Sequence, residues 1–116
     1  GTPRGDDAIG LRDLLVEAVF DYGSGGTDLK VWVQTRVQGG TWRDVMNFAF
    51  TTSDATKWSK CSISIALAAA RTTSDAALAD DTILDGLLGD EVRVKYTSTG
   101  TYAGTPTIKV LGSTKY

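Results

Sequence analysis

Length, composition and charge limit the classes of fold and function to which this chain can belong. The 116 residues suit one domain, and 12 basic against 14 acidic residues leave a net charge of −2, which does not favour nucleic-acid binding. The chain has no histidine and one cysteine, Cys61, so the usual nucleophilic triads and an intrachain disulfide are excluded. No run approaches the ~18 apolar residues that span a bilayer, and we expect no membrane attachment.

The chain begins with a predicted arm followed by a predicted strand. Proline and glycine disfavour regular structure in residues 1–10, so we expect these to form an extended N-terminal arm and residues 11–116 to form the folded domain. In residues 14–22 one set of alternate positions is apolar throughout, which is typical of a half-buried strand. The glycines that follow this strand predict a turn.

A long hairpin is the clearest pattern in the sequence. In residues 29–37, Val31 and Val33 lie on one predicted face and Trp32 lies on the opposite face. Two glycines at 39 and 40 supply the positive φ angles that a tight turn requires. Residues 41–50 are predicted to return antiparallel to the first strand of the hairpin.

The middle of the chain is less regular. Residues 58–65 alternate and predict a strand with Cys61 on its inner face. The alanine-rich residues 66–79 hold either a helical turn, capped by Ser74 or Asp75, or irregular chain. Residues 80–89 are predicted to form a loop that carries apolar plugs.

Two further alternating segments, at 92–97 and 106–111, complete a pattern of about seven or eight short strands with no long amphipathic helix. This pattern predicts an all-β domain, an antiparallel β-sandwich or jelly-roll-like fold. The alternation predicts that one set of residues faces across two sheets as the core: Phe20, Val31, Val33, Val92, Val94, Ile108 and Val110.

Candidate catalytic and metal-binding residues are few. Glu17 and Glu91 are the only glutamates, and no pattern places two acids across one cleft, as carboxylate hydrolases require. The glycine-rich loop at 21–28 offers oxygen ligands for calcium but lacks the acidic spacing of an EF-hand, and three aspartates at 80, 81 and 85 offer similar ligands. We therefore expect no catalytic residue, no metal and no cofactor.

The candidate binding surface combines an outward aromatic residue with two loops. An aromatic ring such as that of Trp32, exposed on a sheet, stacks on sugars or seals a protein interface. We expect Tyr22, Asp28 and Tyr102, in or beside the loops at 23–28 and 99–105, to contribute to the same contact surface. Alternatively, the second sheet or residues 66–88 cover Trp32, which then belongs to the interior.

The hairpin also carries a resemblance. Residues 29–50 read LKVWVQTRVQGGTWRDVMNFAF, which resembles the pattern V-x-V-Q-x-S-x-D-G-x-T-W-x-D-I-x-x-F of small β-sandwich proteins encoded among the structural genes of tailed bacteriophages. Residues 86–97 and 100–110 are similar to the closing strand pair of that family. The chain departs from the pattern at Gln38, where Asp or Asn is usual before the glycine.

This resemblance implies a virion protein located on the capsid or tail surface, most simply a capsid decoration protein that acts by protein–protein binding. The implied partners are the major capsid protein or other virion proteins, and the implied state is a homo-oligomer, a trimer or a dimer. The family brings no catalytic residues. Because the G-G-T-W hairpin also occurs in carbohydrate-binding and sialidase-like repeats, the alternative is a carbohydrate-binding module of a phage tail or fibre.

Overall fold

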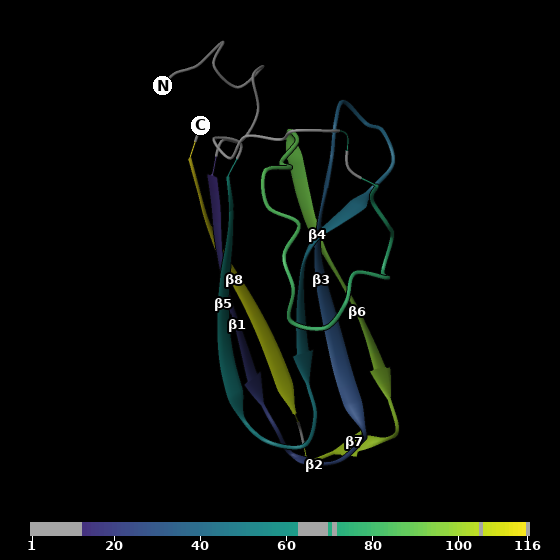
Figure 1. The fold of residues 1–116 in the computed structure, drawn as a ribbon. Helices are drawn as coiled ribbons and strands as arrows, with labels where there is room; N and C mark the ends of the chain where they lie inside the picture. Colours follow the sequence, from purple (N-terminus) through teal and green to yellow (C-terminus); the bar gives the residue numbers. More distant parts are fainter. Residues whose placement is uncertain (1–12, 63–69, 71, 105, 116) are drawn as a thin grey trace.

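Two three-stranded antiparallel sheets pack face to face in the computed structural model, which describes residues 13–62, 70, 72–104 and 106–115 (Figure 1). The prediction of an all-β antiparallel fold is therefore confirmed, whereas the predicted arm at residues 1–10 lies outside the described residues. The strands are β1 (Asp13–Asp21), β2 (Ser24–Gly25), β3 (Asp28–Arg36), β4 (Arg43–Phe50), β5 (Ala55–Ser62), β6 (Glu91–Thr99), β7 (Tyr102–Ala103) and β8 (Thr107–Lys115). Within the described ranges, no helix is long and apolar enough to cross a membrane.

The strand order places β1 and β3 at the centres of the two sheets. One sheet has the order β5-β1-β8, the other has the order β4-β3-β6, and the short pair β2-β7 lies at one end of the sandwich (Figure 1). The buried residues of β1 alternate strictly with exposed or half-buried residues, as the period of a strand requires. The side chains that meet in the core are Leu14, Val16, Ala18, Phe20, Leu29, Val31, Val33, Val45, Met46, Phe48, Phe50 and Cys61.

A bulge interrupts the regular pairing of β3 with β4. Val33 is opposite Met46, but Gln34 is opposite Asp44, so Val45 is an extra residue on β4. A bulge lets two successive residues face inward, and accordingly both Val45 and Met46 are fully buried. Alternation along residues 41–50 does not reveal this shift, because the extra residue changes the parity of the strand.

The predicted core is correct at the centre of each sheet and wrong at one edge position. Phe20, Val31 and Val33 are buried, and Val92, Ile108 and Val110 are partly buried against the core. Val94, however, is 45% exposed. Its strand, β6, is an edge strand, so no described neighbour covers the side of Val94 that faces away from β3.

Residues 72–90 form a long strap over the outer face of the β4-β3-β6 sheet and along the edge of β4 (Figure 1). The strap is held by backbone hydrogen bonds from Asn47 N to Thr82 O (2.9 Å) and from Leu84 N to Val45 O (2.8 Å). Its described part at 72–79 contains no helix, so the helical-turn alternative is not found there; residues 66–69 and 71 lie outside the described residues. Leu87 and Leu88 pack against the core, as expected for apolar plugs.

Candidate binding surfaces

The structure buries the aromatic residue that the sequence placed at the centre of the binding surface. Trp32 does lie on the outer face of β3, but it is only 5% exposed because the strap covers it. Its indole Nε1 donates a hydrogen bond to Leu78 O at 3.1 Å. Trp32 is therefore an interior residue, and the alternative that the segment after β5 covers it is confirmed.

The other three predicted site residues lie near one end of the sandwich. Tyr22 and Tyr102 pack edge to face, with ring centroids 6.1 Å apart, and both rings also contact Phe20. Their hydroxyls donate to backbone carbonyls, that of Tyr22 to Gly25 and that of Tyr102 to Thr51, at 2.8 Å each. Burial raises the pKa of Tyr102, and the nearby carboxylate of Asp28 adds to this. Both tyrosines thus brace the β2-β7 end rather than project from it.

The most highly organised polar group, Asp44, was not singled out by the sequence. Its carboxylate, almost fully buried on β4, accepts hydrogen bonds from Gln34 Nε2 (2.7 Å) and Ser74 Oγ (2.9 Å). It also accepts three backbone N–H bonds from the strap, at 2.9–3.0 Å, donated by Ala76, Ala77 and Leu78. Burial alone would raise the pKa of Asp44, but these donors outweigh it and lower the pKa below its usual range.

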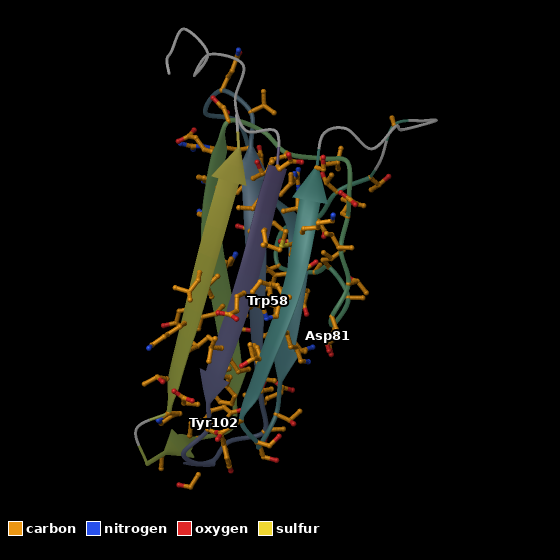
Figure 2. All side chains as sticks on the ribbon, turned by 90° about the vertical axis from the view of Figure 1, so that its left-hand side faces the viewer. Trp58, Asp81 and Tyr102 are labelled. Carbon is orange, nitrogen blue, oxygen red and sulfur yellow. The ribbon has the colours of Figure 1, made fainter. Side chains whose placement is uncertain are left out.

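The aspartates considered for calcium are each engaged with a different part of the chain. Asp81 accepts from Ala49 N at 3.0 Å and from Lys57 Nζ at 2.8 and 2.9 Å (Figure 2 labels its position). Asp85 accepts from Ser62 N, and Asp80 pairs with Lys30. Among the described residues, no three potential ligands form a cluster that could hold a metal ion.

The single thiol is set up as a buried core group. Cys61 is 1% exposed, and its Sγ donates to Leu87 O at 2.8 Å. Burial raises the pKa of this thiol, which keeps it protonated and poorly nucleophilic. A hollow of about 410 Å³ lies between the β3–β4 turn and the end of the strap, and of its charged lining groups Arg36 pairs with Glu91 and Asp44 is engaged as described.

An exposed apolar surface lies on the outer face of the β5-β1-β8 sheet. The Trp58 surface consists of Leu15, Trp58 and Leu111, which are 40%, 62% and 53% exposed, together with Glu17. The register places Trp58 and Leu111 on either side of Glu17 in one row across the three strands. These residues line a shallow hollow of about 230 Å³, and Figure 2 shows Trp58 near the middle of this face.

The predictions from the sequence did not include the Trp58 surface, although the sequence contains a signal for it. Trp58 has the opposite parity to the inward Cys61, and Leu15 and Leu111 occur at outward positions of their strands, most of which are polar. A large apolar residue at an outward strand position is the informative observation, because most such positions carry polar residues.

A second exposed apolar region, the open side, lies between the edge strands β6 and β8. Val94 and Tyr96 of β6 are 45% and 64% exposed, although both lie on the inner face, opposite Val33 and Val31. Ile108 and Val110 of β8 face them and are half-buried. The opposite side of the sandwich, between β4 and β5, is spanned by the strap, whose backbone bonds to β4 and to Cys61, although a hollow of about 410 Å³ remains between them.

Comparisons of this chain with protein-family models, with curated proteins and with solved structures give no match.

Proposed function

We propose that this chain is a structural protein of a bacteriophage particle, which decorates and stabilises the capsid by binding to its protein surface. The Trp58 surface carries the proposal, because three large apolar side chains are exposed together on a flat, regular sheet. Contiguous exposed apolar patches mark sites of interaction, and tryptophan is among the residues that dominate binding energy at protein interfaces.

The rest of the described molecule supports binding over chemistry. The buried carboxylate of Asp44 and the thiol of Cys61 are engaged in holding the strap and the core. The exposed acids Asp75 and Asp81 are paired with Lys95 and Lys57. A rigid sandwich with one apolar face is suited to binding by shape, and the resemblance of residues 29–50 to virion sandwich proteins supports a capsid as the partner.

Binding of this kind stabilises a shell by mass action, because the protein adds free energy only to the assembled state that presents its site. The Trp58 surface would lie against the major capsid protein, and Glu17 at its centre would be paired there with a hydrogen-bond donor or a cation, since a buried unpaired carboxylate is unfavourable. The ends of the strands and the β2-β7 end would remain outside this contact.

The direct test is to add the purified protein to phage heads that lack it and to measure co-sedimentation. We expect saturable binding with a fixed number of copies per head. Trp58→Ser should weaken binding at least about 30-fold, since truncation of a central interface tryptophan removes 2 kcal/mol or more. The matched control is Val37→Ser, which removes an equally exposed apolar side chain from the β3–β4 turn and should leave binding unchanged. Wild-type protein that fails to bind heads would contradict the proposal.

A carbohydrate-binding module of a tail or fibre is the second candidate, and one observation favours it. An exposed tryptophan beside a carboxylate, Trp58 beside Glu17, is an arrangement on which a sugar ring stacks while a hydroxyl is hydrogen-bonded. A glycan array and titration of tryptophan fluorescence distinguish the two functions. Saturable glycan binding that Trp58→Ser abolishes, without any uptake by heads or tails, would replace the capsid proposal with this one.

A further inference from the structure

The two lateral sides of the sandwich differ in whether a described segment packs over them. Between β4 and β5, the strap pairs with the edge of β4 through the Met46–Ile83 bridge and covers the core with Leu87 and Leu88. Between β6 and β8, no described segment does the same. Figure 2 shows this contrast, with β8 and β6 on the left of the view and the green strap on the right.

The open side exposes core-like surface. Two hollows of about 440 and 240 Å³ run along it, one beside Tyr96 and Ile108, the other beside Val94 and Val110. The charged residues of β6 point to the opposite face, where Arg93 Nε donates to Gln34 Oε1 at 2.8 Å and Lys95 pairs with Asp75 at 3.2 Å. The inward positions of both strands therefore present an uncharged, largely apolar strip.

Outward-facing charges lie on both edges, at Arg93 and Lys95 of β6 and at Lys109 of β8, but neither edge is short, bulged or charged on its inner face. Both β6 and β8 are nine residues long, have no proline within the strand, and pair with their inner neighbours without a bulge. Edge strands that must stay unpaired are shortened, bulged, covered, or given lysines, prolines or an inward-pointing charge. Apart from their outward charges, the described parts of these two edges are regular and ready to pair.

We propose that the open side binds a second copy of this chain, so that the β6 and β8 edges of one copy meet the same two edges of the other. This inference deepens the proposed function, on which it rests only for its biological role. A single extended peptide would pair with one edge and leave the other unpaired. A second copy presents two regular edges at the same spacing with an apolar strip between them, and it therefore completes both sheets and the core at once.

The area of the open side is sufficient for a specific dimer. A nine-residue strand is about 30 Å long, and two packed sheets with their side chains are about 20 Å across, which gives a face on the order of 600 Å² per copy. The total of about 1,200 Å² is at the lower end of the range for stable, specific interfaces. Burial of apolar side chains and up to two new pairs of hydrogen-bonded strands would stabilise the dimer over that area.

The test is sedimentation of the purified full chain from micromolar to near-millimolar concentration, in the absence of phage heads. We expect wild type to form dimers and Val94→Lys to weaken the dimer by about 100-fold or more, because the new ammonium would be buried without a partner. Val94 is already 45% exposed, so the monomer should fold with an unchanged melting temperature. The matched control, Thr56→Lys, adds the same charge to the exposed face of β5 and should leave the dimer intact.

Hydrogen exchange provides a readout that does not depend on the variants. Amides of β6 and β8 should exchange more slowly as concentration rises, whereas those of β4 and β5 should not change. A wild type that stays monomeric over the whole range, or a dimer lost in Thr56→Lys and kept in Val94→Lys, would overturn the inference. Monomers that bind heads would leave the proposed function standing, and dimers that ignore heads would refute the proposed function alone.

Discussion

At the scale of single residues, Asp44 has the largest structural role that the sequence conceals. Five donors converge on its carboxylate, and four of them, one hydroxyl and three backbone N–H groups, belong to residues 74–78. The strap in turn covers Trp32 and accepts its indole N–H. One side chain on β4 thus anchors the part of the strap that covers Trp32 on the outer face of the β4-β3-β6 sheet.

Replacement of Asp44 by Asn should therefore destabilise the protein by about 2–4 kcal/mol, because an amide places its own N–H group against donors that then lack an acceptor. Denaturant unfolding of both proteins measures this difference. Asp80→Asn is the control: its carboxylate is about half exposed and only pairs with Lys30 at 3.3 Å, so the change should be below about 0.5 kcal/mol. Equal effects of the two variants would contradict the role given to Asp44.

The contribution of Asp44 to the stability of the folded protein should decrease at low pH. Because the folded-state pKa of Asp44 is lowered, its stabilising effect is fully present above the unfolded-state value of about 3.9 and is lost as pH falls through the folded-state pKa. The stability difference between wild type and Asp44→Asn should accordingly be constant near neutrality and shrink below about pH 4. A difference that grows with acidification would show that the carboxylate is not ionised in the folded protein.

At the scale of elements, alternation predicted the strands well but could not say which strand faces are covered. β1 and β6 alternate in the same way, yet β1 lies between two strands and β6 has one neighbour in its sheet among the described strands. Burial at an edge depends on what packs beside it, which is a property of the whole fold. The same limit explains Trp32, whose cover comes from residues 46 positions further along the chain.

The strap itself could not be predicted in detail. It has no periodic pattern, and its attachments link residues about 30 positions apart, such as Ser74 with Asp44 and Asp81 with Asn47. What the sequence did supply was the loop with apolar plugs at 80–89 and the alternative that residues 66–88 cover Trp32. The Trp58 surface could also have been predicted, because it follows from the parity of three strands that were correctly identified.

The difference between centre and edge leads to a prediction about two residues that face each other. Val33 and Val94 are paired across β3 and β6, but their exposures are 1% and 45%. Val33→Asp should destabilise the monomer by about 3–5 kcal/mol, as expected for an unpaired buried charge. Val94→Asp should change it by less than about 1 kcal/mol, because water reaches that carboxylate. Thermal or urea unfolding at a concentration too low for dimers measures both, and similar losses would mean that the open side is in fact closed.

At the scale of the whole molecule, the Trp58 surface and the open side have a geometric relationship. When like strands pair, β6 with β6 and β8 with β8, antiparallel pairing requires a two-fold axis perpendicular to the sheets. Such an axis keeps the outer face of β5-β1-β8 on the same side in both copies. The two Trp58 surfaces then lie on one flat face of the dimer, where both contact the same capsid surface.

A dimer with two contacts on one face should bind heads more tightly than either copy alone, because the second contact forms at a high effective concentration. Val94→Lys, which leaves the Trp58 surface intact, is therefore expected to weaken binding to heads by about 10- to 100-fold while still saturating the same number of sites. Trp58→Ser removes the contact itself and should weaken binding in the dimer and in a Val94→Lys background alike. The measurement is co-sedimentation with heads across a dilution series of wild type, each single variant and the double variant. If Val94→Lys binds heads as tightly as wild type while it is monomeric in solution, the two surfaces act independently and the bivalent arrangement is wrong.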